Sequence, residues 1–205
     1  MAKIGLIDYG MGNIHSVVKA IENLKEEILI VNKIEQFKEC RALIIPGQGA
    51  FDPAMENLEK TGLIQDLKDW IKKGNSFLGI CLGLQLLFES SEEGNSKGLG
   101  LLKGDIKKIP NEDNQRLPHI GWCNLVPTKE SKLLKINELD NWFYFDHSYC
   151  AIPLKQEIIS ANVIYGSINL TAMIEENNIT ACQFHPEKSG RKGEMLLRRW
   201  IESIN

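Results

Sequence analysis

Hydrophobic positions in the first half of the chain follow two alternating patterns. Nearly unbroken apolar runs predict strands over residues 3–8, 27–31, 42–45 and 76–80. Between them, apolar residues recur at helical spacing and predict helices over 14–25 and 63–73. Apolar strands that alternate with helices are typical of a parallel sheet covered on both faces. The first half therefore predicts an α/β fold.

The second half has a different pattern of short strand-like runs, broken by Gly, Pro and Asn. These runs lie at 99–102, 105–109, 142–145, 157–164, 168–174 and 179–184, before a last helix over 192–203. We expect partly antiparallel pairing here, and the polar stretch 110–116 is predicted as a mobile loop. No linker or repeat divides the chain. Residues 1–205 are predicted as one α/β domain with an open, mixed, mainly parallel sheet flanked by helices.

Composition and charge limit which kinds of partner and which cellular compartment we expect. The chain has 205 residues, of which 43% are hydrophobic, enough for one sizeable core. A net charge of −3 without a basic cluster argues against nucleic acid or an anionic membrane as the main partner. No apolar run approaches the ~20 residues of a membrane span, and no leader is visible. Five cysteines without C-x-x-C spacing disfavour zinc and suit a reducing compartment, so we expect a cytoplasmic protein without a metal site.

One cysteine stands at the junction of a predicted strand and a predicted helix. Residues 77–80 are predicted to form a buried strand, Cys81 follows, and helix-forming residues continue over 82–89. A strand-turn-helix junction of this kind exposes a nucleophile, and Gly79 and Gly83 remove side chains that would crowd the turn. An inert buried thiol is the alternative interpretation, since cysteine is often buried.

A base and its partner follow about a hundred residues later. His185-Pro186-Glu187 come directly after the apolar run 179–184. Alternate residues of an extended chain face the same way, so Glu187 is placed to orient the imidazole of His185 while the other ring nitrogen faces a thiol. The sequence therefore predicts a Cys81–His185–Glu187 triad. Taken alone, His185 could equally be an ordinary core or surface histidine.

Four motifs together resemble the class I (triad) glutamine amidotransferases, over essentially the whole chain. They are GICLGLQ around Cys81, HPEKSG from His185, DYGMGN from Asp8 and PGQGAF from Pro46. PHIGW from Pro118 and HSY from His147 narrow the resemblance to the glutaminase subunits of imidazole glycerol phosphate synthases. The resemblance implies a flavodoxin-like fold with a cysteine nucleophile elbow, and hydrolysis of glutamine to glutamate and ammonia without a cofactor.

The resemblance also implies which residues bind L-glutamine. Substrate and oxyanion contacts are expected at Gly47, Gln48, Gly49, Leu82, Gln85, Ser148 and Tyr149. Backbone N–H groups of the 46–49 segment and of Leu82 would stabilise the oxyanion. Two ordinary alternatives stay open: a Pro-Gly turn at 46–49, and Gln85 as a simple helix former.

A partner is implied because free ammonia is protonated in water and ceases to be a nucleophile. In the resembled family the partner is a (β/α)8-barrel cyclase subunit, which forms a heterodimer and makes imidazole glycerol phosphate and AICAR in histidine biosynthesis. Asn13, Trp122, Tyr144 and Lys188 are expected at the interface and the ammonia exit. From the sequence alone, core packing is the more common role of aromatic residues such as Trp122 and Tyr144.

The chain departs from the family pattern at four positions, and other functions stay open. Gln48 replaces a usual valine, Cys123 a usual asparagine, Asp146 an aliphatic residue and Cys150 an aromatic one. The alternatives are the amidotransferase subunit of another synthase, such as anthranilate synthase, a catalytically silent regulatory relative, and a cysteine peptidase of similar fold.

Overall fold

The computed structural model describes residues 2–111, 116–138 and 140–204. Residues 112–115 of the predicted mobile loop lie outside the described residues.

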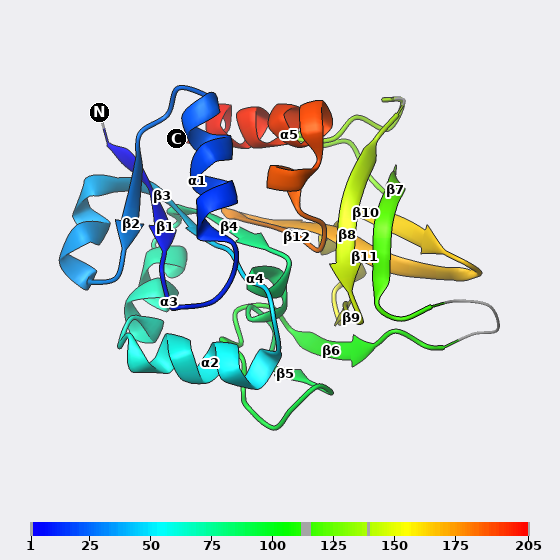
Figure 1. Ribbon diagram of the computed structural model, residues 1–205, viewed down its shortest axis with the longest axis horizontal. Helices are drawn as coiled ribbons and strands as arrows, with labels where there is room; N and C mark the ends of the chain where they lie inside the picture. Colours follow the sequence, from blue (N-terminus) through cyan, green and yellow to red (C-terminus); the bar gives the residue numbers. More distant parts are fainter. Residues whose placement is uncertain (1, 112–115, 139, 205) are drawn as a thin grey trace.

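A mixed sheet runs through the centre of the described chain (Figure 1). Its nine strands lie in the order β2 (Ile28–Val31), β1 (Lys3–Ile7), β3 (Cys40–Ile45), β4 (Ser76–Ile80), β12 (Ile179–Cys182), β11 (Ile168–Glu176), β10 (Ile159–Tyr165), β7 (His119–Pro127) and β8 (Trp142–His147). The first five strands pair in parallel, and pairing from β12 through β8 is antiparallel. The predicted α/β fold with a mixed sheet is confirmed.

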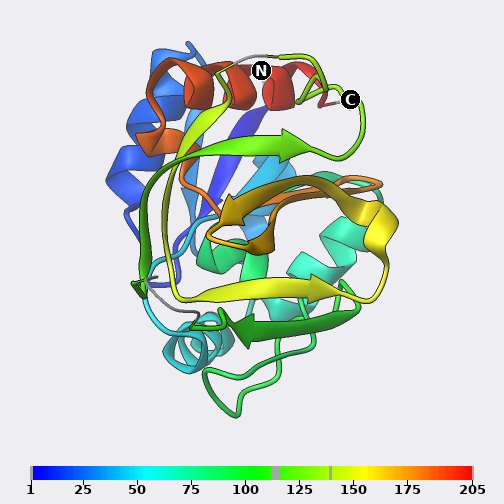
Figure 2. The ribbon, with the colours of Figure 1, turned by 90° about the vertical axis from the view of Figure 1, so that its right-hand side faces the viewer.

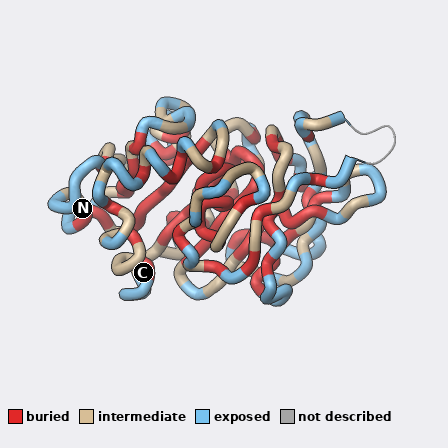
Figure 3. The backbone as a smooth tube through the Cα atoms, turned by 90° about the horizontal axis from the view of Figure 1, so that it is seen from below, coloured by how far each residue is buried: buried red, intermediate tan, exposed pale blue. Residues whose placement is uncertain are grey.

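Helices cover both faces of the parallel half (Figure 1). Helices α1 (Ile14–Asn23) and α5 (Gly190–Glu202) pack on one face, through apolar residues such as Val17 and Leu197. Helices α2 (Phe51–Lys60) and α3 (Ile64–Lys72) pack on the other, through Phe51 and Leu67. Buried backbone therefore runs through the middle of the molecule, with exposed segments around it (Figure 3). A short 3-10 helix, η1 (Ile34–Glu39), leads into β3.

A second, smaller sheet lies beside the antiparallel half (Figure 2). It contains β5 (Ser90–Ser91), β6 (Gly104–Lys108) and β9 (Tyr149–Pro153), and η2 (Gln156–Ile158) follows it. Strand β8 ends at His147 and β9 begins at Tyr149, so Ser148 is the corner between the two sheets. The backbone N–H of Ile109 donates to the carbonyl of Ser148 at 2.9 Å and fixes that corner.

The hydrophobic pattern missed helix α2, strands β5, β7 and β9, and the short 3-10 helices that precede β3 and follow β12. Helix α2 has the expected i, i+3, i+4, i+7 spacing in Phe51, Ala54, Met55 and Leu58, all buried. Strand β7 was hidden because its outward face also carries large apolar side chains, Trp122 among them, which obscures the alternation of buried and exposed residues.

Two predicted elements around residue 90 were wrong, and for one shared reason. The helix after Cys81 is a single turn, α4 (Leu82–Gln85), and 99–102 is not a strand. The carbonyls of residues 86–88 accept hydrogen bonds from the N–H groups of residues 99–102 at 2.8–3.0 Å. Because those carbonyls are taken by a distant segment, the helix cannot continue.

Candidate active site

Four chain segments meet at one edge of the sheet. Strands β1, β3, β4 and β12 are consecutive neighbours in the sheet and run parallel. Their carboxyl ends lead into the turn at Tyr9, the segment from Pro46, Cys81, and Gln183 with His185. Ligand sites in open α/β sheets form at this edge.

Cys81 has a positive φ, with φ 54° and ψ −109°, which is a strained backbone conformation for a residue other than glycine. Its N–H donates to the carbonyl of Cys182 at 2.7 Å, which ties the turn to β12. The turn depends on its glycines. A Cβ at Gly83 would lie 2.0 Å from the carbonyl oxygen of Ile45, and one at Gly79 would lie 2.8 Å from the oxygen of Gly83. The predicted sharp turn at Cys81 is confirmed in its backbone geometry.

His185 and Glu187 form a buried pair. Nδ1 of His185 lies 2.8 Å from Oε1 of Glu187, and both side chains are 2% exposed. Glu187 lies in a short 3-10 helix, η3 (Pro186–Lys188), so it reaches the imidazole from a turn and not from the extended chain that the sequence suggested. The other ring nitrogen, Nε2, is buried and has no hydrogen-bond partner among the described residues.

The charges around His185 favour its protonated form. Burial alone lowers the pKa of an imidazole, but the interactions of His185 with the side chains of Cys81 and Glu187 outweigh burial and raise its pKa to about 10. These interactions therefore favour the charged form of the imidazole beside Cys81. A thiol, an imidazole and a carboxylate lie together, which is the combination of groups that acyl-transfer sites use.

Gln183 is a further side chain at the sulfur. It is fully buried, and its Nε2 donates to Sγ of Cys81 at 3.6 Å. Its Oε1 accepts a hydrogen bond from Nε2 of Gln85 at 3.1 Å. Gln183 was not predicted from the sequence. The available signal was a single amide within the otherwise apolar run 179–184.

The segment from Pro46 packs directly against the turn at Cys81. The hydroxyl of Tyr9 donates to the carbonyl of Pro46 at 2.7 Å. A Cβ at Gly47 would lie 2.7 Å from Cβ of Leu82, and Gly49 has φ +106°, a conformation that favours glycine. Burial raises the pKa of Tyr9, and negative charge on Cys81 raises it further. The hydroxyl therefore stays protonated and holds this segment close to the sulfur.

A cavity of ≈240 Å³ opens beside Cys81. Its walls include six of the seven residues expected to bind substrate: Gln48, Gly49, Leu82, Gln85, Ser148 and Tyr149. Gly47 does not line it. The other wall residues are Cys81 itself, Glu93, Pro118, Asp146 and His147.

Glu93 also lines the cavity beside Cys81, and it was not predicted from the sequence. Its Oε2 accepts a hydrogen bond from the N–H of Phe51 at 2.8 Å. That bond brings a carboxylate from a distant loop to the cavity. No local sequence pattern marks such a position.

The hydrogen bonds of Gln85 decide what it can offer a ligand. Its Nε2 donates to the carbonyl of Tyr149 at 3.3 Å and to Oε1 of Gln183 at 3.1 Å. Both N–H donors of its amide are therefore used, and its Oε1 is left as an acceptor. The carbonyls of Ser148 and Tyr149 also accept protein hydrogen bonds already.

Three of the four expected interface residues lie together. The ring centroids of Trp122 and Tyr144 are 6.1 Å apart, and Nζ of Lys188 lies 5.9 Å from the centroid of Tyr144. Trp122 is 51% exposed, so it is not a core residue. The backbone carbonyl of Tyr144 accepts from the N–H of His185 at 2.9 Å, which links this cluster to the triad.

Asn13 has a different structural role. Its side chain caps α1 by accepting from the N–H of Ser16 at 3.2 Å.

No helix in the described part of the chain is long and apolar enough to cross a membrane. Within the same residues, no group of three or more histidine, cysteine, aspartate or glutamate side chains is arranged to hold a metal ion.

Comparison with known sequences places the chain among glutaminases. The family described as "Glutamine amidotransferase class-I" matches residues 5–203. A Prochlorococcus marinus protein named "Imidazole glycerol phosphate synthase subunit HisH" is 66% identical over 204 residues, covering 100% of both chains. A Synechococcus protein of the same name is 50% identical and covers 98% of this chain and 95% of that one.

Solved structures share the fold. A structure described as "Structure of PurLQS from Thermotoga maritima" matches with a TM-score of 0.75 over 100% of both chains, at 16% identity. Another, described as "Crystal structure of glutamine amidotransferase", matches with a TM-score of 0.72 over 97% of each chain, at 19% identity. At this identity the likeness concerns the fold alone.

Proposed function

Since the chain belongs to the class-I glutamine amidotransferase family, we propose that it hydrolyses glutamine through Cys81, His185 and Glu187. The observation that carries this is the cavity beside Cys81, with the His185–Glu187 pair next to the sulfur. The sulfur attacks the side-chain amide carbon of glutamine, and a C–S bond forms. Protonated His185 gives its proton to the departing nitrogen as the C–N bond breaks, and ammonia leaves.

A γ-glutamyl thioester then remains on Cys81. Neutral His185 takes a proton from water, the hydroxide attacks the thioester, and the C–S bond breaks to release glutamate. Glu187 holds Nδ1 of His185 at 2.8 Å throughout, so that Nε2 is the nitrogen that exchanges the proton. Gln183 donates a hydrogen bond to the sulfur of Cys81 and holds it in place beside the cavity.

Substrate glutamine is bound by groups that match its charges. The carboxylate of Glu93 and Oε1 of Gln85 accept hydrogen bonds from its α-ammonium. The carbonyl of Tyr149 already accepts two hydrogen bonds and that of Ser148 accepts one, so this edge binds the substrate mainly through hydrogen-bond donors. We assign its α-carboxylate to that edge. The amide of the substrate then extends toward Cys81.

Oxyanion stabilisation falls to backbone N–H groups. The N–H of Leu82 directly follows the nucleophile, and the 47–49 segment packs on the same turn. The side chain at Gln48 lines the cavity, so a polar group adjoins the peptide that would turn its N–H toward the developing charge.

The ammonia passes to a second subunit. The relatives that are 66% and 50% identical are named as subunits of imidazole glycerol phosphate synthase, which supports the same role here. We propose a heterodimer with a (β/α)8-barrel cyclase that forms imidazole glycerol phosphate and AICAR in the cytoplasm. Its docking surface includes Trp122, Tyr144 and Lys188, which connect to His185 through the backbone of Tyr144. Asn13 would lie at the edge of this surface.

The test is glutamate release by the purified chain, alone and with a histidine-pathway cyclase carrying its nucleotide ligand. We expect weak release by the chain alone and strong activation in the complex. Trp122→Ala should lose the activation and keep the basal rate. Activity that does not depend on the cyclase would point to another synthase, such as anthranilate synthase. No release under either condition would favour a silent relative, and partner-independent cleavage of peptides would favour a peptidase.

A further inference from the structure

Three side chains outside the triad form a continuous hydrogen-bonded chain that ends at the wall of the cavity. Sγ of Cys123 lies 3.1 Å from Nε2 of His119. Nδ1 of His119 lies 2.9 Å from Nε2 of His147. Nδ1 of His147 lies 2.8 Å from the carbonyl oxygen of Tyr149. The chain runs from β7 across the start of the β7–β8 pair, where His119 faces His147, to the first residue of β9.

The carbonyl oxygen of Tyr149, at the end of this hydrogen-bonded series, determines which atom donates in each of the three hydrogen bonds. A backbone carbonyl can only accept, so Nδ1 of His147 carries the hydrogen. In a neutral imidazole Nε2 is then the acceptor, and Nδ1 of His119 must donate to it. Nε2 of His119 is in turn an acceptor, and the S–H of Cys123 donates to it. All three donors therefore point toward the carbonyl of Tyr149.

The surroundings keep both imidazoles neutral, as this pattern requires. Burial lowers the pKa of His119 to about 4. Burial also lowers the pKa of His147 to about 3, assisted by His119 and His185 and opposed by the bond to Tyr149. Burial raises the pKa of Cys123, which preserves its S–H. His119 is packed between aromatic rings, with centroids 5.1 Å from Phe145 and 4.1 Å from Tyr165.

The carbonyl of Tyr149 joins this chain to the groups around the nucleophile. It accepts from His147 on one side and from Nε2 of Gln85 on the other. Gln85 continues through Gln183 to Sγ of Cys81. Two separate networks thus fix one peptide in the wall of the cavity.

We propose that Cys123, His119 and His147 are positioning residues that orient the Tyr149 peptide, and with it the amide of Gln85, for binding the α-amino and α-carboxylate groups of glutamine. This inference rests on the proposed glutaminase function and adds to it a specificity network that reaches from β7 to the substrate. Loss of the network acts on substrate binding, because the triad keeps its own contacts.

Two substitutions at His147 test the hydrogen bond that its Nδ1 donates separately from the volume of its side chain. The amide nitrogen of asparagine can occupy the place of Nδ1 and donate to Tyr149. The longer glutamine places its amide near Nε2, where it faces His119 instead. For the complex with the cyclase, we expect His147→Gln to raise KM for glutamine about tenfold with a smaller change in kcat, and His147→Asn to keep KM within about threefold of the wild type.

A merely structural role gives a different result. It predicts that both variants lose melting temperature and kcat in parallel, with KM unchanged, and that outcome would overturn the inference. The same comparison of KM can be made at Cys123, where the hydrogen-bonded series begins. Cys123→Ser keeps a donor to His119 and should retain the wild-type KM, whereas Cys123→Ala should raise it.

A second measurement needs neither activity nor a variant. Long-range ¹⁵N–¹H correlation spectra of the wild-type chain should show His119 and His147 as neutral Nδ1–H tautomers at pH 7. An Nε2–H tautomer or a charged ring at either position would contradict the proposed direction of the chain. If the wild-type complex releases no glutamate, the glutaminase proposal fails, and these spectra still decide the hydrogen-bonded chain independently.

Discussion

Nδ1 of His185 and Oε1 of Glu187 lie 2.8 Å apart, in a pair whose side chains are each 2% exposed. The pair is formed by residues two apart in the sequence, because His185 ends an extended segment and Glu187 lies in the 3-10 turn that follows. Helix α5 packs directly against that turn. Gly193 lies so close that a Cβ there would be 1.9 Å from the carbonyl oxygen of Pro186. The orientation of the His185 imidazole therefore depends on the junction of β12 and α5.

Removing the charge of Glu187 should slow chemistry and spare binding. We expect Glu187→Gln to lower kcat for glutamine hydrolysis by about 10²–10⁴-fold, because the imidazole loses its orientation and its stabilised proton. KM should change little, since Glu187 does not line the cavity beside Cys81. Steady-state kinetics of the complex test this. Glu194→Gln is the matched control, since Glu194 is an exposed carboxylate of α5 paired with Arg198.

The same pair predicts how stability depends on pH. The pKa of His185 rises to about 10 in the folded chain, whereas a free histidine has a pKa of about 6.5. Its contribution to stability is therefore complete below about pH 6.5 and is lost as the pH rises toward about 10. The free energy of urea unfolding should fall over that window, and fall less steeply in Glu187→Gln. Equal slopes for the two proteins would contradict this.

The backbone at Cys81 predicts a trade between stability and activity. With φ 54° the residue lies where only glycine is unstrained, and such strain is worth about 1–3 kcal/mol. Neither Cys81→Gly nor Cys81→Ala has a thiol, so their difference isolates the backbone. We expect Cys81→Gly to be more stable than Cys81→Ala by about 1 kcal/mol in chemical denaturation. The opposite order would show that the turn is unstrained.

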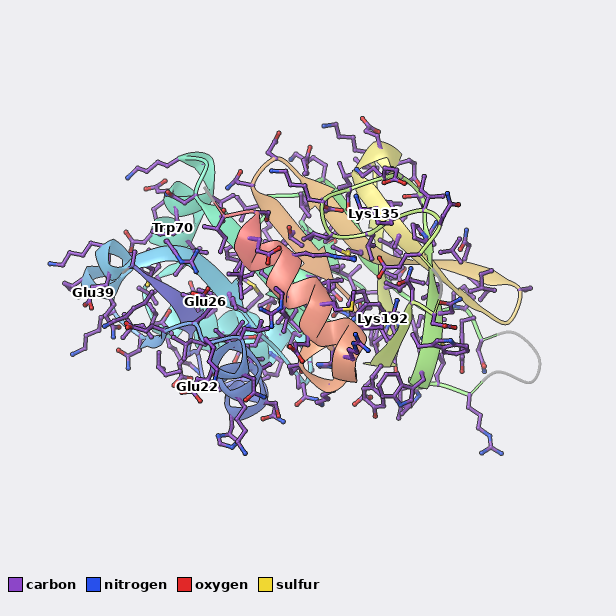
Figure 4. The ribbon with its side chains drawn as sticks, turned by 90° about the horizontal axis from the view of Figure 1, so that it is seen from above. Glu22, Glu26, Glu39, Trp70, Lys135 and Lys192 are labelled. Atoms are coloured by element: carbon purple, nitrogen blue, oxygen red, sulfur yellow. The ribbon has the colours of Figure 1, made fainter. Side chains whose placement is uncertain are left out.

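A second, half-buried charge cluster lies away from the site and should affect stability alone. Oε2 of Glu138 lies 2.7 Å from Nη1 of Arg199, and its Oε1 lies 3.2 Å from Nζ of Lys192. Both cations belong to α5, which crosses the sheet with Lys192 near its first turn (Figure 4). The hydrogen bond from Arg199, with that from Lys192, lowers the pKa of Glu138 despite its burial.

We expect Glu138→Gln to destabilise the fold by about 1–3 kcal/mol at pH 7, with KM for glutamine unchanged. The wild type keeps this stabilisation above the unfolded pKa of glutamate, about 4.3, and loses it as the pH falls through the lower folded pKa. The difference between the two proteins in urea unfolding should therefore shrink as the pH falls below about 4. A constant difference would show that the carboxylate charge is not what matters.

The site residues that could be predicted from the sequence are those that directly follow a predicted strand. Cys81 and His185 each follow an apolar run directly, so the parallel sheet brings them to one edge. Gln183 and Glu93 were missed because their roles depend on contacts across long stretches of chain, to Cys81 and Phe51 respectively. The carbonyl of Tyr149 carries no side-chain signal at all.

The fold shows the same division. The parallel strands of the first half were predicted, because strands buried on both faces remain apolar throughout, whereas helix α2 of the same half was missed. Strand β7 was missed as well, since Ile120 and Trp122 are apolar but more than half exposed, at 57% and 51%. The prediction of strands from hydrophobic residues assumes that apolar side chains are buried, so it fails where they are exposed. Here the exposed apolar residues lie on the surface that we propose for the partner.

The most direct test of the triad is to combine glutamate release with peptide mass spectrometry after an acid quench, for the wild-type complex and for Cys81→Ala. We predict glutamate release by the wild type, a γ-glutamyl adduct on the peptide that contains Cys81, and neither in the variant. Glutamate release that persists in Cys81→Ala, or an adduct on another residue, would contradict the assignment of Cys81 as the nucleophile.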